Sequence, residues 1–349
     1  ILDGFMLNQT LLNGEMTGYC HSDDTLTLTD SGFKHYDEID ENDKIGCYNP
    51  NTQTLEYHSY LQKHVYDFNG DLINFKTDKI DILVTPNHRM YVQPRGHTEF
   101  KFIEAKDVAL RAKTISSINN FLGNDLSDVK ISDTLSISIR NYCKLVGLYV
   151  SEGCTASEKR INRKNQITTL SICQSINGKA RDAIKEVYKD TFNTHYETST
   201  SVSVYKPELA QHFSLYYGNH SYVKRLAPWI KNLKTEYLQI IIDMMILGDG
   251  CEHRYEHTSR KIPNYSYYTS SRQLANDFAE LAFKCGYAVK ISNYKKNSTK
   301  IYYNKSGHEY KTKHPQWVVY ISRGFKGKYP NLESKAKNAN VISAQHYDG

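Results

Sequence analysis

Two apolar stretches about a hundred residues apart constrain this chain more than any other feature. Leu145–Gly153 and Ile242–Gly250 each begin like a buried helix and end in an acid followed by glycine. Glycine tolerates the left-handed conformation that often closes a helix, so we expect both helices to end there. Because the helix dipole makes this end partially negative, Glu152 and Asp249 each cost about 0.3–1 kcal/mol without a nearby cation. Two such acids at matching places predict a shared cation site.

The sequence that follows each stretch repeats in the same order of strand, helix and strand. The matching segments are Thr168–Cys173, Ala180–Tyr188 and Ser199–Tyr205 after the first stretch, and Tyr265–Thr269, Leu274–Cys285 and Val289–Tyr294 after the second. Such a repeat predicts two similar α/β lobes related by a pseudo-twofold axis, over about 135–235 and 236–330. The two acids would then meet where the lead helices meet. Met244 stands where the first stretch has Gly147, so we expect looser helix contact on that side.

The part of the chain before the repeat is predicted to be all-β. Residues 20–113 contain short alternating runs separated by turn signals such as Ser31-Gly32 and Asn69-Gly70-Asp71, which indicates a compact all-β unit. Ser116–Asp133 is rich in serine, asparagine and aspartate, so we place a linker at 114–134. The predicted fold class is therefore multi-domain, with an all-β domain followed by a two-lobed α/β domain.

Cys20 and His88 are the residues of the β part that suggest chemistry. Taken separately, a lone cysteine is usually a small buried residue, and a lone histidine a surface or satisfied core group. Together, Cys20-x-x-x-Asp24-Thr25, Asp43-Lys44-Ile45 and Thr85-x-x-His88 resemble the N-terminal part of an intein, the Hint domain of self-splicing proteins. The joint match leaves little room for coincidence.

The intein resemblance implies a role for each of these residues. A cysteine thiolate can attack the preceding carbonyl, here that of Tyr19, and form a thioester. By resemblance His88 transfers the proton and Thr85 orients the amide. Residues 1–19 would be the tail of a host protein, the N-extein, and 331–349 the start of the C-terminal Hint part. Because no terminal histidine–asparagine pair follows, we expect a fragment that can form the thioester but cannot finish splicing.

The two lead stretches carry a second resemblance. Together with Tyr268-Thr269-Ser270-Ser271 they resemble LAGLIDADG homing endonucleases, which are commonly found inserted in inteins. This implies that Glu152 and Asp249 bind Mg²⁺, or another divalent cation, and that each acid serves one strand of a DNA duplex. The alternative is an inactive nucleic-acid-binding module of the same shape with an inert Hint remnant.

Basic side chains are dense from Tyr294 to Lys328 and are interleaved with tyrosine and tryptophan, although the net charge of the chain is only +6. A charge run is often only a solvated face. Here it alternates along predicted hairpins, as in a β-ribbon that lies in a DNA groove. The candidate DNA-binding residues, which include two before this region, are Arg254, Arg272, Lys295, Lys296, Lys300, Lys311, Lys313 and Arg323.

Cysteine usage and hydropathy bear on where the protein acts. Seven cysteines form no CxxC pair, which predicts reduced thiols in a cytoplasmic protein rather than a disulfide framework or a zinc site. The longest apolar run, Leu238–Leu247, is far shorter than the roughly 20 residues that span a bilayer. We therefore expect no membrane partner. The two resemblances imply a monomer whose partners are double-stranded DNA and, covalently, the host protein.

Overall fold

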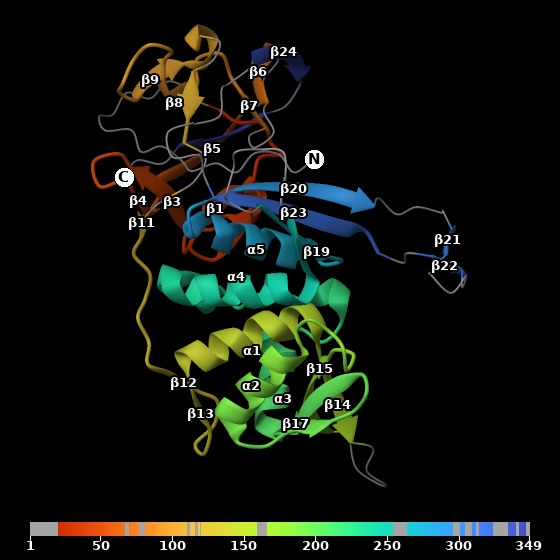
Figure 1. Ribbon diagram of the computed structural model, residues 1–349. Helices are drawn as coiled ribbons and strands as arrows, with labels where there is room; N and C mark the ends of the chain where they lie inside the picture. The colour runs from red at the N-terminus through yellow and green to blue at the C-terminus, as the bar shows by residue number, and fades with distance from the viewer. Residues whose placement is uncertain are drawn as a thin grey trace. The chain divides into compact units, whose positions relative to one another are not determined.

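The structure is a computed structural model, and it divides the chain into two compact units (Figure 1). Unit 1 comprises Ile1–Leu122, Ala282–Lys290 and Ile321–Gly349, and unit 2 comprises Gly123–Leu281 and Ile291–Tyr320. The structure describes residues 20–66, 70–76, 81–109, 112–115, 118, 120–158, 166–253, 264–295, 301–303, 309–311, 314–323, 334–339 and 342–346. Among these residues, no helix is both long and apolar enough to cross a membrane.

Residues 20–122 of unit 1 form strands and two single-turn 3-10 helices in their described part, as the predicted all-β segment requires. A five-stranded sheet has the order β11-β4-β3-β1-β2, and a three-stranded sheet the order β10-β8-β9. The strands are β1 (Thr27–Thr29), β2 (Gly32–Lys34), β3 (Lys44–Asn49), β4 (Thr54–Ser59), β5 (Gln62–Tyr66), β6 (Gly70–Lys76), β7 (Asp81–Val84), β8 (Arg89–Gln93), β9 (Lys101–Glu104), β10 (Lys113–Thr114) and β11 (Asn120–Phe121). The helices are η1 (Tyr36–Glu38) and η2 (Ala105–Asp107).

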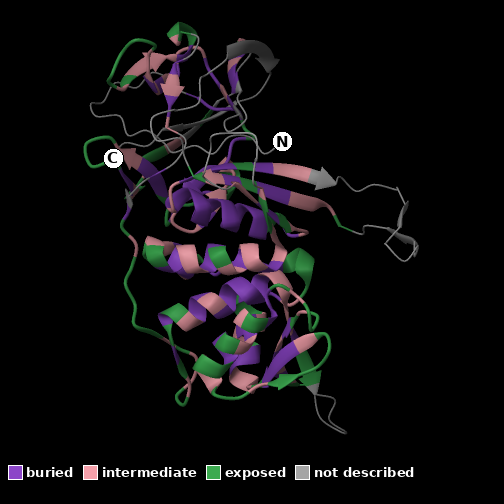
Figure 2. Cartoon of the chain, in the orientation of Figure 1, coloured by how far each residue is buried: buried purple, intermediate pink, exposed green. Residues whose placement is uncertain are grey.

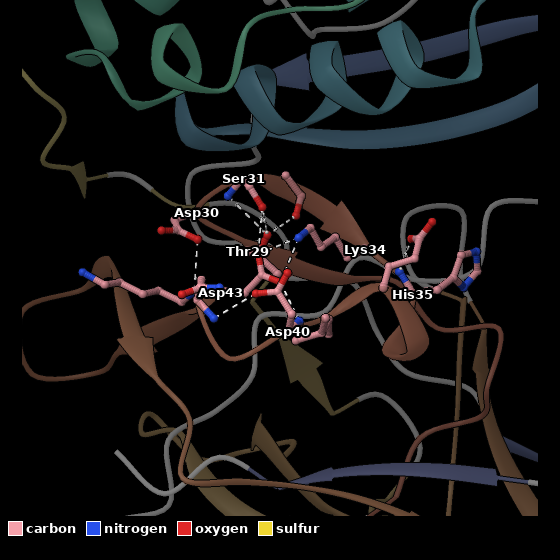
Figure 3. Close-up of polar contacts among 12 residues, drawn as sticks. Thr29, Asp30, Ser31, Lys34, His35, Asp40 and Asp43 are labelled. Carbon is pink, nitrogen blue, oxygen red and sulfur yellow. Dashed lines mark hydrogen bonds and ion pairs between the residues drawn. The ribbon is translucent and has the colours of Figure 1, made fainter.

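Asp43 organises the turns that join the first strands of unit 1 (Figure 3). Its carboxylate accepts hydrogen bonds from Lys34 Nζ at 2.7 and 2.8 Å, from Ser31 Oγ at 2.9 Å and from the Asp40 amide at 2.9 Å. Burial opposes the ionised carboxylate, but these donors together hold the pKa of Asp43 below its ordinary value. The Asp43-Lys44-Ile45 segment therefore has a structural role here, because it fixes the start of β3.

Two segments near the end of the chain pair with strands near its beginning. In unit 1, β24 (Ser334–Ala339) lies antiparallel to β6, and β25 (Ile342–His346) lies antiparallel to β5. The predicted linker also contains strands: β11 joins β4 in parallel, and β12 (Asp128–Lys130) pairs with β13 (Ser136–Ser138). Strands of two or three residues are too short to show a periodicity in the sequence, which is why this segment was predicted as a linker.

The repeat lies mostly in unit 2, whereas 282–290 and 321–323 of its second half belong to unit 1. Its first half comprises α1 (Ile139–Glu152), β14 (Gly153–Glu158), β15 (Gln166–Cys173), α2 (Arg181–Phe192), β16 (Tyr196–Glu197), β17 (Ser201–Tyr205) and α3 (Pro207–Tyr217), followed by the 3-10 helices η3 (Ser221–Val223) and η4 (Pro228–Asn232). The second half comprises α4 (Thr235–Asp249), β18 (Gly250–His253), β19 (Asn264–Thr269), α5 (Arg272–Lys284), β20 (Tyr287–Lys295), β21 (Ile301–Tyr303), β22 (Glu309–Lys311) and β23 (Gln316–Arg323).

The two halves have sheets of matching order. The first sheet runs β14-β15-β17-β16 and the second β18-β19-β23-β20, so the strand after the lead helix lies at the edge in both. The predicted repeat is therefore confirmed at the level of elements. The division between the units passes through α5, β20 and β23, whereas the sequence placed these elements wholly in the second lobe.

Tyrosine forms much of the core around α1, which Figure 2 shows as a largely buried helix. Tyr142, Tyr149 and Tyr217 are fully buried. The hydroxyl of Tyr142 is 2.7 Å from that of Tyr217, and Tyr149 donates to the carbonyl of Gly218 at 2.9 Å. These pairings satisfy the buried hydroxyl groups, so these three tyrosines belong to the core rather than to a binding surface.

Candidate functional site

The helices α1 and α4 lie side by side in unit 2 (Figure 1). A Cβ on Gly147 would lie 2.6 Å from the Met244 Cβ and 2.7 Å from the Ile241 carbonyl oxygen. A Cβ on Gly248 would lie 2.6 Å from the Ser151 Cβ. The expected loose contact at Met244 is therefore wrong. The absence of a side chain on Gly147 accommodates the methionine, and Gly248 provides a second close approach one turn later.

Both lead helices end at the predicted glycines, but not in the predicted conformation. Gly153 has φ −89° and Gly250 has φ −103°, so both are extended rather than left-handed. A Cβ on Gly153 would lie 2.3 Å from the Tyr149 ring, and one on Gly250 would lie 2.5 Å from the Ile246 Cα. Glycine is needed here because the chain turns back closely over the last helical turn.

A lysine ammonium group lies at the C-terminal end of each lead helix, α1 and α4, where a cation was expected. Lys224 Nζ donates to the carbonyl oxygens of Tyr149 at 2.9 Å and Gly153 at 2.8 Å. Lys179 Nζ donates to the carbonyl oxygens of Gly250 at 2.7 Å and Ile246 at 3.4 Å, the two residues that match Gly153 and Tyr149 in the repeat. The two ammonium groups therefore occupy matching places and offset the negative ends of both helix dipoles.

Glu152 and Asp249 influence each other electrostatically. Burial, followed by the negative charge of Glu152, raises the pKa of Asp249 to about 7, although Lys179 and Lys224 oppose this. Burial also raises the pKa of Glu152, which Lys179 and a hydrogen bond from Gln174 oppose; Gln174 Nε2 donates to Glu152 Oε1 at 3.0 Å. The pKa values of both acids are therefore raised even though two lysines lie nearby, so the ionised carboxylates are not fully stabilised by the protein alone.

Asp249 lines an open cavity of about 210 Å³ in unit 2. Most of the other lining residues are polar: Ser151, Ser221, Tyr268, Thr269, Ser270 and Gln316, with Val150 as the apolar exception. The segment from Tyr268 to Ser270, which the sequence singled out, therefore lies beside one of the predicted acids.

The candidate DNA-binding residues are placed only in part. Arg272 and Arg323 are exposed, with their guanidinium carbons 5.7 Å from the Trp317 ring centroid and 5.0 Å from the Tyr287 ring centroid, respectively. Lys295 lies in β20 and Lys311 in β22, but their side chains are not described. Arg254, Lys296, Lys300 and Lys313 lie outside the described residues. Their roles in DNA binding stay predictions.

Unit 1 brings Cys20, Thr85 and His88 together. The Cys20 amide donates to Thr85 Oγ1 at 3.2 Å, and the Thr85 amide donates to the Cys20 carbonyl at 3.0 Å. The His88 amide donates to the Thr85 carbonyl at 3.0 Å, and the His88 ring centroid lies 4.3 Å from that of His21. All four residues are buried. The turn after β7 thus holds a hydroxyl group against the peptide nitrogen of Cys20.

The electrostatics of this cluster favour neutral groups. Burial raises the pKa of the Cys20 thiol to about 11 and lowers the pKa of His21 to about 4. Burial and the neighbouring His21 also lower the pKa of His88 well below its ordinary value. At neutral pH, His88 is therefore a neutral imidazole.

Sequence reasoning missed Gln174, Lys179 and Lys224. All three come from loops or strand ends of the first half, where no hydrophobic period marks a position. Lys224 is 2% exposed, and the burial of a single lysine cannot be read from the sequence. The available signal was electrostatic, because an acid at a helix C-terminus requires a cation nearby.

Two curated proteins are similar in sequence to this chain. One is the ATP-dependent Clp protease proteolytic subunit of Chlamydomonas moewusii, 24% identical over 289 residues, which are 76% of this chain and 28% of that protein. The other is the DNA-directed RNA polymerase subunit beta C-terminal section of Stigeoclonium helveticum, 21% identical over 313 residues, which are 77% of this chain and 29% of that protein. The chain thus spans less than a third of either relative's length. No protein-family profile matches it.

Solved structures similar to parts of the chain include homing endonucleases and a split intein. The endonuclease I-DmoI with its target DNA is 13% identical, covering 53% of this chain and 89% of that one, with a TM-score of 0.35. The LAGLIDADG homing endonuclease I-GzeII with its DNA target is 10% identical, covering 52% and 77%, with a TM-score of 0.28. The AceL NrdHF class 3 split intein is 24% identical, covering 27% and 59%, with a TM-score of 0.24.

Proposed function

We propose that unit 2 is a metal-dependent, site-specific endonuclease of double-stranded DNA of the LAGLIDADG type. The observation that carries the proposal is the pair of coupled acids at matching ends of α1 and α4, where the charge of Glu152 raises the pKa of Asp249. Phosphodiester hydrolysis needs concentrated negative charge that can hold a cation. Two acids on a pseudo-twofold axis provide one such group for each strand of a duplex.

The residues at this site fit a bound Mg²⁺. Both acids are half-buried, and the repulsion by which Glu152 raises the pKa of Asp249 is the kind that a divalent cation relieves. Mg²⁺ is usually held by one or two carboxylates plus water and phosphate oxygens, so the protein needs to supply few ligands. Glu152 and Asp249 would hold the ion, which supplies a water of lowered pKa and offsets phosphate charge.

The other residues of the site position the reacting groups. Gln174 fixes the orientation of Glu152 through its 3.0 Å hydrogen bond. Burial lowers the pKa of Lys224 to about 7, so this lysine can hold or release a proton near neutral pH, and its charge acts on Asp249. The open cavity beside Asp249 would leave room for water and a phosphate group at a bound cation. The predicted basic residues of the β20 to β23 region would bind the DNA backbone.

A cleavage assay with matched acid variants tests the nuclease proposal. A plasmid library with randomised inserts, incubated with the purified chain and Mg²⁺, should yield linear products that define one target sequence. The double variant Glu152→Gln, Asp249→Asn should lose linear product, whereas Asp243→Asn, a change to an exposed acid on the same helix, should keep it. Binding of the selected duplex without cleavage by the unmodified chain would favour the alternative of a binding module.

A second activity, an N-to-S acyl shift at Cys20, is supported by the contacts of the Cys20 amide. The thiol sulfur would bond to the Tyr19 carbonyl carbon, the C–N bond would break, and the thiol proton would pass through His88 to the released amine. Thr85 Oγ1, 3.2 Å from the Cys20 nitrogen, would hold that nitrogen in place. The raised pKa of the Cys20 thiol makes a neighbouring proton acceptor necessary.

The two sequence relatives also support the idea of a portable splicing element. One is named as a protease subunit and the other as an RNA polymerase subunit, yet each matches about three quarters of this chain. Each match covers less than a third of the relative. A segment shared by otherwise different proteins is what an inserted element would produce. On this proposal, residues 1–19 come from a host protein.

Thiol-induced release tests the acyl shift. Incubating the chain with dithiothreitol should release residues 1–19 as a peptide, because an external thiol cleaves a thioester but leaves an amide intact. Cys20→Ala should abolish release, whereas Cys47→Ala, a change to another buried cysteine of unit 1, should keep it. Release that persists in Cys20→Ala, or its absence from the unmodified chain, contradicts the proposed shift.

A further inference from the structure

Two cysteines face each other beside the proposed nuclease site. Cys154 in β14 and Cys173 at the end of β15 have their sulfur atoms 3.8 Å apart. Cys154 is half-buried and Cys173 is exposed. Cys154 comes two residues after Glu152, and Cys173 directly precedes Gln174, which donates a hydrogen bond to Glu152. The thiol pair thus connects the two segments that fix the position of this acid.

The strand register explains why this pair occurs in the first half. Gly153 lies opposite Ile172 and Cys154 opposite Ser171, so Cys173 is the next residue beyond the partner of Gly153. In the second half, Gly250 lies opposite Tyr267 and Cys251 opposite Ser266. The place that corresponds to Cys173 is therefore occupied by Tyr268. The second half repeats the first cysteine without the second, and so offers a natural control.

We propose that Cys154 and Cys173 form a reversible disulfide that displaces Glu152 and Gln174 and thereby inhibits DNA cleavage. The effect on cleavage rests on the proposed nuclease function, whereas the formation of the disulfide does not. A disulfide requires a sulfur–sulfur distance of about 2.05 Å, so the thiols must approach each other from 3.8 Å. Because the two cysteines adjoin the end of α1 and Gln174, this movement acts directly on the acid.

The oxidation balances with a peroxide as the oxidant. The Cys154 sulfur attacks one peroxide oxygen, the O–O bond breaks, and a sulfenic acid and one water form. The Cys173 sulfur then attacks the sulfenic sulfur, and the hydroxyl leaves as a second water. Two thiols lose two electrons and two protons in total, and the peroxide is reduced.

Peptide mapping tests the disulfide independently of nuclease activity. The full chain is treated with hydrogen peroxide, its remaining thiols are blocked with N-ethylmaleimide, and it is digested without reductant. We expect a cross-linked peptide that joins Cys154 to Cys173, about 2 Da lighter than the sum of its reduced parts, and its loss on treatment with dithiothreitol. Cys173→Ser should give no such peptide, and Cys251→Ser should give it unchanged. Absence of the cross-link from the oxidised wild-type chain overturns the proposal.

Cleavage of the selected duplex then tests the effect on the site. Oxidised wild type should cleave about 10²-fold more slowly than the reduced chain, because displacements near 1 Å cost about this much. Reductant should restore the rate. Cys173→Ser should resist peroxide, and Cys251→Ser should stay sensitive. An unchanged rate in the cross-linked chain overturns the inhibition. If the reduced chain does not cleave DNA, the nuclease proposal fails instead, and the cross-linked peptide alone decides whether the disulfide forms.

Discussion

The C-terminal ends of α1 and α4 are built on one plan but differ in their surroundings. Each ends in an acid and an extended glycine, and each presents its last carbonyl oxygens to a lysine. At α1 the lysine is the buried Lys224, and Gln174 also holds Glu152. At α4 the lysine is the exposed Lys179, and Asp249 borders an open cavity.

The two halves of the repeat therefore share the backbone conformation at the helix ends, but they differ in the burial of the lysine and in the hydrogen bonding of the acid. Both lysines belong to the first half of the repeat, so the end of α4 is stabilised by the half to which it does not belong. The buried lysine lies at the end of the helix whose acid is fixed by a hydrogen bond. Asp249 is the acid whose pKa is raised to about 7, so it depends more on an added cation.

The largest expected effect comes from removing either acid alone. Glu152→Gln and Asp249→Asn should each lower the rate of double-strand cleavage roughly 10³-fold or more, since each removes a charge that the transition state requires. If the two ends serve separate strands, the single variants should accumulate nicked plasmid. Gel separation of supercoiled, nicked and linear DNA measures this. Equal loss of nicking and linearisation in both variants would show that the acids act as one group.

Replacing the two lysines compares the buried cation with the exposed one. Lys224→Met should reduce cleavage about 10²-fold, because it leaves two helix carbonyls without their donor and removes a charge close to Asp249. Lys179→Met should cost about tenfold or less, because water can replace an exposed ammonium group. Single-turnover cleavage rates distinguish the two. A larger loss in Lys179→Met would reverse the comparison.

The next largest effect is a loss of stability when the close contact between α1 and α4 is crowded by an added side chain. Gly147→Ala should lower the free energy of unfolding by about 1–3 kcal/mol, because its Cβ meets the Ile241 carbonyl oxygen as well as Met244. In Gly248→Ala the new Cβ mainly contacts the Ser151 Cβ, so adding Ser151→Gly to this variant should restore the lost stability. Urea unfolding of the three variants and the wild type tests this. If Gly147→Ala leaves stability unchanged, the packing described for this point is wrong.

The smallest expected effect is a pH-dependent stabilisation in metal-free buffer. The pKa of Asp249 is raised in the folded state, so its ionisation destabilises the protein increasingly from about pH 4 to about pH 7 and fully above that. Asp249→Asn should therefore raise Tm by a few degrees at pH 8 and leave it unchanged near pH 3.5. Differential scanning calorimetry with a chelator measures both. A stabilisation that is independent of pH would exclude this cause.

The elements with a long hydrophobic period were predictable from the sequence. The lead helices, α2 and α5 and the central strands of the repeat lie close to their predicted ranges, since helices of this length present a full apolar face. Strands β14 and β18 were missed because each directly continues a helix through the glycine that was interpreted only as a helix end. The two acids were found because a helix C-terminus disfavours them.

The remaining part of the site depends on tertiary contacts that no local pattern encodes. Lys224 and Lys179 reach helix ends 71 residues away along the chain, and a lysine in a loop gives no sign of such a contact. The same holds for Thr85, which meets Cys20 across 65 residues. That contact was anticipated only because the two motifs resemble those of a known family.

The pairing of β24 with β6 joins residues that are very far apart in the chain. Phe75 lies opposite Ser334, about 260 residues later. The entropy of closing a loop grows only with the logarithm of its length, about 0.6 kcal/mol for each doubling. Extending a ~30-residue connection to this length therefore costs about 2 kcal/mol, or less when the intervening residues fold by themselves. A β structure closed by its own last strands can thus accept a long insertion at little thermodynamic cost.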